Sequence, residues 1–311
     1  MPTPPSRRLA ALVAGASLAL LAGCGSSDSD SDGSASPSPA AASAIPVVAS
    51  TNVYGDIVGQ IGGAKVDVTS IISDPDQDPH SYEANTQNQL ALSKAKVVVE
   101  NGGGYDDFVD RMLKSGNSSA EVVNAVKISG KTAPKGGELN EHVWYDFPTV
   151  AKIADSVAAA LGKADPANAA TFTKNAETFK AKLKPLEAKE AQIKKAHGGE
   201  AVAITEPVPL YMIEASGLTN ATPAEFSEAI EEGSDVSPKV LQAALALFSG
   251  KKVQALVYNA QTSGPQTEKA EAAAKAAGIP VVPVTETLPS GKDYLGWMTS
   301  NVDALASALD K

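Results

Sequence analysis

Two histidines and two glutamates could together bind a divalent metal ion. His80 stands in the sequence Asp-Pro-His-Ser-Tyr-Glu, and His142 in Glu-His-Val-Trp-Tyr-Asp. Glu206 and Glu286 each follow directly after a short, mostly apolar run. Neutral imidazole nitrogens and carboxylate oxygens are ligands that suit Mn²⁺, Fe²⁺ and Zn²⁺. We therefore take these four residues as the candidate ligands of one transition-metal site.

Each candidate ligand follows a predicted β-strand. His80, His142, Glu206 and Glu286 come, in this order, after the predicted strands 66–72, 121–126, 201–205 and 281–285. A polar loop precedes His80, and a loop rich in glycine and lysine precedes His142. In open α/β sheets, ligands bind in the crevice outside the carboxyl ends of parallel strands. Two lobes facing each other would therefore bring all four groups to one cleft.

Strands and helices are predicted to alternate along the whole chain after residue 44. The other predicted strands are 45–50, 97–99 and 253–258. Helical spacing of apolar residues predicts helices at 52–61, 85–95, 105–113, 208–215, 238–248, 266–277 and 293–309. This alternation predicts an α/β fold with two similar lobes, each a mostly parallel sheet flanked by helices.

A long segment of helix-forming residues, 166–197, separates the two predicted lobes, 45–165 and 198–311. As one helix it would span about 45 Å. Pro166 suits the first turn, and a Gly-Gly pair follows the end. Pro185 should kink the helix. Two ordinary helices within one domain are the alternative, but we favour a single rigid helix joining the lobes. His197, at its end, can favour the helix dipole and is left as structural.

The N-terminus has the features of a bacterial lipoprotein signal peptide. Two arginines precede an apolar run, Leu9–Leu21, which is followed by Ala-Gly-Cys24. We predict cleavage after residue 23, lipid attachment to Cys24 and a flexible tether over 24–44. A chance cysteine beside an ordinary cleavage site is the alternative. Because Cys24 is the only cysteine, a disulfide within the chain and a cysteine-based metal site are both excluded.

The charge of the chain argues against nucleic-acid binding. The formal net charge is −10, and removal of residues 1–23, with two arginines and no acid, makes it −12. The remainder keeps one arginine, Arg111. Nucleic-acid binding requires clustered Lys and Arg to neutralise phosphates, so we exclude it. An acidic surface is compatible with cation capture.

Several short segments of this sequence together match the pattern of a known family. They are Ala49–Asn52, Asp78–Glu83, Glu141–Asp146, Thr222–Glu225, Gly278–Pro280 and Tyr294–Met298. With them the sequence resembles, from Ile45 to Lys311, the cluster A-I solute-binding proteins of ABC importers for zinc and manganese. The resemblance implies two α/β lobes, a rigid linking helix and one metal site between the lobes.

The resemblance also implies roles for the four candidate ligands. His80 and His142 match the two histidines of the N-terminal lobe. Glu206 matches a position that is His or Glu among relatives, and Glu286 matches one that is usually Asp. Should Glu286 not bind the metal, Asp293 is the next candidate. The loop 129–141 lacks the histidines found in many zinc-specific relatives.

We therefore expect a binding protein and not an enzyme. Its expected place is the extracytoplasmic face of the bacterial cell membrane, where Cys24 anchors it as a monomer. The expected partners are the permease and ATPase of an ABC importer. The expected cargo is Mn²⁺ or Zn²⁺, with Fe²⁺ a further option and Mn²⁺ slightly favoured. An exported metallohydrolase and a surface adhesin with a structural metal are the alternatives.

Overall fold

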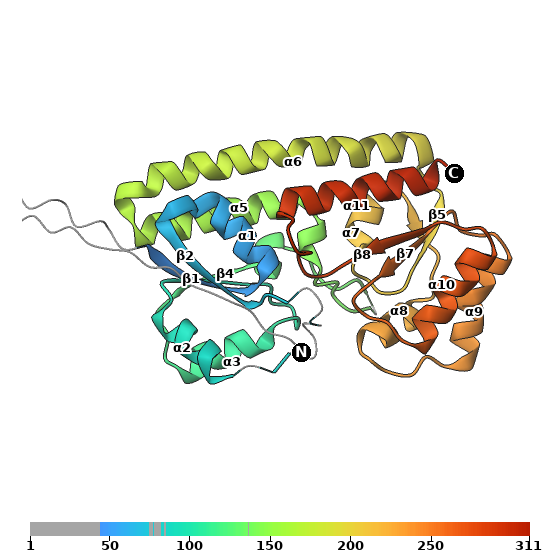
Figure 1. Ribbon diagram of the computed structural model, residues 1–311, viewed down its shortest axis with the longest axis horizontal. Coiled ribbons are helices and arrows are strands. Elements are labelled where there is room, and N and C mark those ends of the chain that lie inside the picture. Colours follow the sequence, from blue (N-terminus) through green and yellow to red (C-terminus); the bar gives the residue numbers. More distant parts are fainter. Residues whose placement is uncertain (1–43, 75–76, 78–81, 84, 136) are drawn as a thin grey trace, which may run out of the picture. The chain divides into compact units, whose positions relative to one another are not determined.

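Parallel strands alternate with helices in a computed structural model that describes residues 44–74, 77, 82–83, 85–135 and 137–311. The N-terminal lobe contains β1 (Ile45–Thr51), α1 (Asn52–Gly62), β2 (Val66–Ile72), α2 (Thr86–Lys94), β3 (Val97–Glu100), α3 (Asp107–Ser115), β4 (Glu121–Asn124), α4 (Ala125–Ser129) and α5 (Phe147–Ala164). The C-terminal lobe contains β5 (Ala201–Ile204), α7 (Leu210–Ala215), β6 (Thr219–Asn220), α8 (Ala224–Glu231), α9 (Pro238–Ser249), β7 (Leu256–Asn259), α10 (Pro265–Ala276), β8 (Val281–Val284) and α11 (Tyr294–Leu309). The predicted α/β fold with two lobes is confirmed (Figure 1).

The two sheets share one strand order. The N-terminal sheet runs β2-β1-β3-β4 and the C-terminal sheet β6-β5-β7-β8, with every pair parallel. In the first sheet Val47 lies opposite Val68 on one side and Val97 on the other. The chain therefore reverses its direction of winding beside β1 and beside β5. In such sheets this point marks the ligand-binding crevice.

One long helix, α6 (Ala169–His197), joins the lobes after a short 3₁₀ turn at Pro166–Asn168. It packs against α5, α1 and α11 (Figure 1). The predicted linking helix is therefore confirmed. The helix continues through Pro185, which is exposed, as is Ala181 one turn earlier. Because solvent can bond the carbonyl that Pro185 leaves without a donor, the proline does not end the helix.

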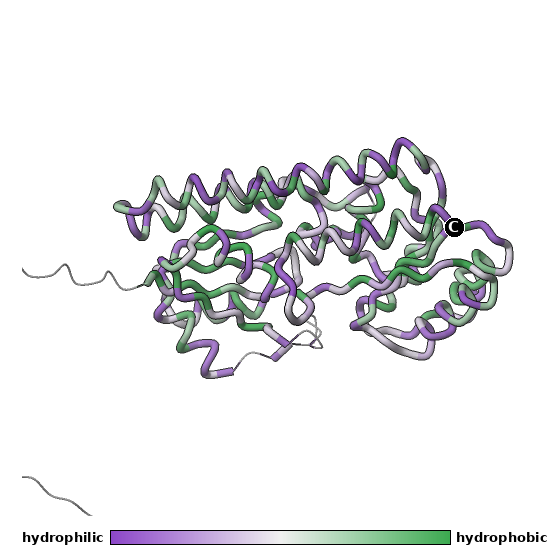
Figure 2. The backbone as a smooth tube through the Cα atoms, turned by 45° about the horizontal axis from the view of Figure 1, so that its top comes forward, coloured by the Kyte–Doolittle hydropathy of each residue, from purple (hydrophilic) through white to green (hydrophobic). Residues whose placement is uncertain are grey.

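The buried face of α6 anchors both lobes. Its buried residues recur every three or four positions and are Phe172, Ala176, Phe179, Leu183, Leu186, Glu190 and Ile193. The apolar ones belong to the largest hydrophobic cluster, which also includes β1 and β8. Figure 2 shows hydrophobic strands in both lobes and an alternation of hydrophilic and hydrophobic segments along α6. The helix is therefore a shared part of the core.

Three tyrosine hydroxyls donate hydrogen bonds to main-chain carbonyls of the opposite lobe. Tyr145 donates to Thr285 at 2.7 Å. Tyr211 donates to Asn140 at 2.6 Å, and Tyr294 donates to Trp144 at 2.5 Å. Tyr145 and Tyr294 are fully buried. The lobes thus meet through specific polar contacts as well as through the apolar cluster.

Two predicted strand boundaries needed correction, and the helices α4, α5 and α8 and the short strand β6 were not predicted. The fourth strand ends at Asn124, because the Asn124 side chain accepts a hydrogen bond from Lys127 N and caps α4; Val126 is therefore helical. The strand predicted at 253–258 is β7, Leu256–Asn259. Helix α5 was not predicted, although Asp146 caps it and a proline occupies its first turn.

The predicted signal peptide, the Cys24 lipidation site and the tether lie outside the described residues. Within the described part of the chain, every helix is too short or too polar to cross a lipid bilayer.

Candidate metal centre

One asparagine amide connects Glu206 and Glu286 at the carboxyl edge of the C-terminal sheet. Glu206 follows β5 and Glu286 follows β8, while Asn259 ends β7, which lies between these strands. The Asn259 amide nitrogen donates to Glu206 Oε2 and, at 2.8 Å, to Glu286 Oε1. Both glutamates are only 2 % exposed. The sheet thus places two buried carboxylates close together, as predicted for residues that follow the carboxyl ends of parallel strands.

Neighbouring polar side chains fix the turn that carries Glu286. Gln261 Oε1 accepts hydrogen bonds from Glu286 N at 2.5 Å and from Thr287 N at 3.1 Å. Thr205 Oγ1 accepts from Asn259 N at 2.9 Å. Binding sites gain affinity when their supporting residues hold the ligands in place before binding. The positions of Glu206 and Glu286 are therefore preorganised.

His142 is fully buried and projects its Nε2 toward the glutamates of the other lobe. Asn140 Oδ1 lies 2.7 Å from Nδ1 and accepts from His142 N at 3.1 Å. Nε2 lies 3.4 Å from Glu231 Oε1 and 3.9 Å from Glu286 Oε2. Because the amide oxygen of Asn140 accepts a bond from Nδ1, Nδ1 carries a proton. Nε2 is then the nitrogen that can bind a metal ion.

Glu231 is the acidic residue that sequence reasoning missed. It ends helix α8, whereas the predicted ligands all follow strands. Within the described residues, Glu141, His142 and Glu231 each offer a ligand atom, and these atoms lie within 4.8 Å of one another. Nothing in the local sequence distinguishes Glu231 from the exposed Glu232 beside it. Its position beside His142 follows only from the packing of the two lobes against each other.

Burial and mutual repulsion raise the pKa values of these groups. Burial, followed by the charge of Glu286, raises the pKa of Glu206 to about 8. Burial also raises the pKa of Glu231 to about 8, although His142 opposes the shift. Burial lowers the pKa of His142, but the Glu286 hydrogen bond and the Glu231 charge outweigh it and raise this pKa to about 9.

These shifts show that the metal-free site holds protons near neutral pH. A buried cluster with three carboxylates is unfavourable when all three are ionised. A divalent cation provides the missing positive charge and displaces the protons, because metal ligands must be deprotonated. The arrangement is therefore chemically suited to hold a divalent cation.

The structure brings together three of the four predicted ligands, His142, Glu206 and Glu286. His80 lies outside the described residues. Asp293, the alternative to Glu286, is exposed and caps α11 by accepting from Gly296 N at 2.7 Å. His197 lies at the end of α6, near Glu200 and Asp310.

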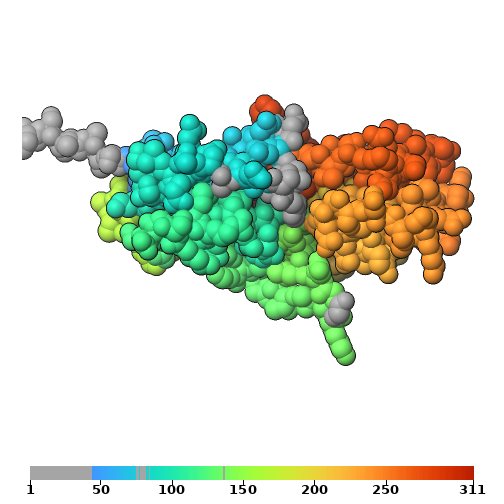
Figure 3. Space-filling view, turned by 90° about the horizontal axis from the view of Figure 1, so that it is seen from below, coloured from blue at the N-terminus to red at the C-terminus, as the bar shows by residue number. Residues whose placement is uncertain are grey.

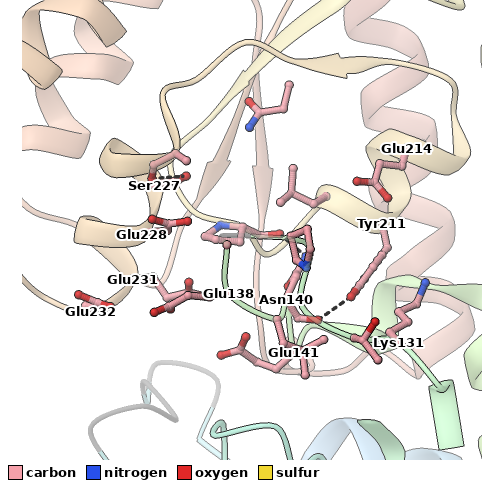
Figure 4. Close-up of a pocket in the computed structure, with 18 of the residues that line it drawn as sticks. Lys131, Glu138, Asn140, Glu141, Tyr211, Glu214, Ser227, Glu228, Glu231 and Glu232 are labelled. Carbon is pink, nitrogen blue, oxygen red and sulfur yellow. Dashed lines mark hydrogen bonds between the residues drawn. The ribbon is translucent and has the colours of Figure 1, made fainter. Parts of the chain in front are cut away.

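A cavity of about 880 Å³ borders the cluster. It is lined by the segment between α4 and His142, together with parts of α7 and α8. Figure 3 shows part of this segment, in green, projecting from the surface. Figure 4 labels the six glutamates of the lining, which are Glu138, Glu141, Glu214, Glu228, Glu231 and Glu232. Glu231 belongs to both the cavity wall and the buried cluster.

The sequence is similar to curated metal-transport lipoproteins along most of its length. It is 26 % identical over 285 residues to the manganese ABC transporter substrate-binding lipoprotein ScaA of Streptococcus gordonii, covering 85 % of this chain and 89 % of that protein. It is 25 % identical over 288 residues to the iron ABC transporter substrate-binding lipoprotein MtsA of Streptococcus pyogenes, covering 86 % and 89 %.

Solved structures share the fold. The periplasmic zinc-binding protein TroA of Treponema pallidum superposes with a TM-score of 0.72 at 21 % identity, covering 85 % of this chain and 99 % of that one. The binding protein FpvC of Pseudomonas aeruginosa, in complex with Ni²⁺, gives 0.71 at 23 %, covering 86 % and 97 %. Residues 47–308 match the family described as ZnuA, zinc-uptake complex component A, periplasmic. The chain therefore belongs to the ZnuA family.

Proposed function

We propose that this protein captures a divalent transition-metal ion outside the cytoplasmic membrane and delivers it to the permease of an ABC importer. The observation that carries the proposal is the buried cluster of His142, Glu206 and Glu286, which draws an imidazole from one lobe and carboxylates from the other. Glu206 Oε1 is buried and has no hydrogen-bond partner among the described residues. A bound cation would satisfy this oxygen.

The proposed ligands are His142, Glu206, Glu286 and His80. The position of His80 in the sequence, after the strand that borders β1, supports its inclusion. Cys24 is the proposed lipid anchor, with a signal peptide over 1–23 and a tether over 24–44. The proposed lobes are 45–165 and 198–311, and the protein acts as a monomer beside its permease and ATPase.

Mn²⁺ is the proposed cargo, with Zn²⁺ the close alternative and Fe²⁺ a further one. The described ligands include more carboxylate oxygens than nitrogens, and hard oxygen donors suit Mn²⁺ and Fe²⁺ better than Zn²⁺. Relatives named for manganese and iron transport support this order. Zn²⁺ should nevertheless bind well in vitro, because its intrinsic affinity for such sites exceeds that of Mn²⁺.

No observation favours the alternative functions over transport. The relatives and the family are components of metal uptake systems, which supports binding and delivery over hydrolysis. A laminin-binding adhesin of Streptococcus agalactiae shares the fold at 22 % identity, and this likeness concerns the fold alone.

Metal titration of the purified, metal-stripped protein tests the proposal. We expect one Mn²⁺ or Zn²⁺ ion per chain, bound saturably, and a loss of at least tenfold in affinity in His142→Ala. His197→Ala is the matched control, because this histidine contacts Glu200 and Asp310 at the end of α6. Equal losses in both variants, or no saturable binding by the unmodified protein, would refute it.

A further inference from the structure

Glu231 is mostly buried and lies close to His142, unlike an ordinary surface glutamate. Its side chain is 15 % exposed, and its Oε1 lies 3.4 Å from His142 Nε2. The same nitrogen lies 3.9 Å from Glu286 Oε2. Glu231 and Glu286 therefore approach the metal-binding nitrogen of His142 from the C-terminal lobe. A cation bound to that nitrogen would meet both carboxylates.

An ion pair with His142 alone does not account for the local charge. Three carboxylates lie in this cluster, because Asn259 connects Glu206 to Glu286 and His142 Nε2 lies near both Glu286 and Glu231. One imidazolium can balance only one of them. Lys131 lines the neighbouring cavity, but its ammonium group lies 3.3 Å from Asp146 and over the Tyr211 ring. Glu206 Oε1 is buried in the same cluster and has no hydrogen-bond partner among the described residues, so this oxygen is available to bind a cation.

The cavity gives a cation access to Glu231. Its wall also carries Glu138, Glu228 and Glu232 (Figure 4). Most charged residues of this wall are acidic, and a wall with an excess of negative charge attracts cations. Glu231 is therefore the carboxylate of the buried cluster that an incoming cation meets from this side.

We propose that Glu231 is a direct ligand of the bound metal ion and supplies a third carboxylate to the site. This inference rests on the proposed function and refines the class of cargo. Carboxylates from Glu206, Glu231 and Glu286 with His142 give a ligand set dominated by oxygen. Such a set suits ions that accept six ligands, such as Mn²⁺ and Fe²⁺, better than four-coordinate Zn²⁺.

The test compares Glu231→Gln with Glu225→Gln in the protein purified in detergent with its N-terminal segment intact. The two variants lose the same charge from the same helix, α8, and Glu225 is exposed and does not line the cavity. We expect Glu231→Gln to weaken Mn²⁺ binding at least tenfold and Zn²⁺ binding less. Glu225→Gln should stay within about twofold of the unmodified protein, because an exposed charge is screened by salt.

Electron–nuclear double resonance of bound Mn²⁺ separates ligation from an indirect effect on His142. Loss of the Glu231 oxygen should admit an additional exchangeable water to the ion. Equal affinities of the two variants, or an unchanged number of bound waters, would overturn the inference. Glu231→Asp, which keeps the carboxylate, should bind better than Glu231→Gln, and it serves if the Gln variant does not fold.

The same titrations distinguish the two proposals. Absence of saturable metal binding in the unmodified protein would remove the proposed function itself. If the unmodified protein binds one ion, His142→Ala weakens this binding and Glu231→Gln binds normally, only the proposed role of Glu231 is refuted.

Discussion

Glu190 should make the stability of this protein fall as the pH rises toward 8. It occupies a core position on α6, between Leu186 and Ile193, and is 4 % exposed. Its Oε1 has no hydrogen-bond partner among the described residues. Burial, followed by the charges of Asp146 and Glu187, raises the pKa of Glu190 from 4.5 to about 8. The folded protein therefore holds this carboxyl in its protonated form at neutral pH.

The size of the effect follows from the pKa shift. A group with a raised folded-state pKa stabilises most below its unfolded value, here 4.5, and this contribution is lost between pH 4.5 and about 8. One pKa unit corresponds to about 1.36 kcal/mol, so at pH 7 the protonation of Glu190 costs about 3 kcal/mol of stability. Glu190→Gln removes this ionisable group. Its stability advantage over the unmodified protein should grow by about 2.5 kcal/mol between pH 5 and pH 7.

Urea unfolding at pH 5 and pH 7, with a chelator present to remove metal, measures this difference. Glu177→Gln is the matched control, because Glu177 is exposed on the same helix. A difference in unfolding free energy between Glu190→Gln and the unmodified protein that is the same at both pH values would reflect only the new amide. The reasoning fails if the offset does not change with pH, or if the control changes equally.

Three further results are expected. Metal affinity should rise more than tenfold per pH unit between pH 6 and 8. The reason is that His142 and Glu206, whose pKa values are about 9 and 8, must both lose protons before they bind the ion. A metal affinity that does not change with pH in competition titrations would contradict this. Glu206→His should shift the preference between Mn²⁺ and Zn²⁺ toward Zn²⁺ by about tenfold, measured as a ratio of dissociation constants, and an unchanged ratio would count against oxygen selectivity. Cys24→Ser should release the protein from the membrane fraction with its metal affinity unchanged, and continued membrane association would refute the lipid anchor.

Hydrophobic periodicity predicted most elements, because the central strands are short apolar runs that are buried on both faces. All of β3 is buried, and its sequence Val-Val-Val-Glu is typical of a buried strand. Boundaries failed where a side chain competes with the backbone. The Asn124 cap ended β4 before Val126, and Asp293 became a helix cap although its charge had made it a candidate ligand.

The ligands could be predicted where topology alone places them. Glu206 and Glu286 follow β5 and β8, which lie on either side of β7 in one parallel sheet, so their proximity follows from strand order. Glu231 reaches His142 only because α8 of one lobe approaches a loop of the other. That approach depends on packing between distant segments, and neither periodicity nor spacing carries this information. Glu190 escaped notice for a similar reason, because a helix-forming glutamate looks the same in a core as on a surface.

The three tyrosine bonds between the lobes oppose spontaneous opening of the protein. Separation of the lobes would break the hydrogen bonds of Tyr145, Tyr211 and Tyr294 to opposite carbonyls. At about 1 kcal/mol for each bond, these alone would keep the opened form below about 1 % of the population. A captured ion would then leave slowly while the protein diffuses, and binding to the permease would have to supply the free energy for release. Because the acceptors are main-chain carbonyls, substitutions of the Trp144 and Thr285 side chains leave these bonds in place. Substitution of Asn140 would also keep its carbonyl, but it would remove the bond from the Asn140 side chain to Pro207 of the other lobe.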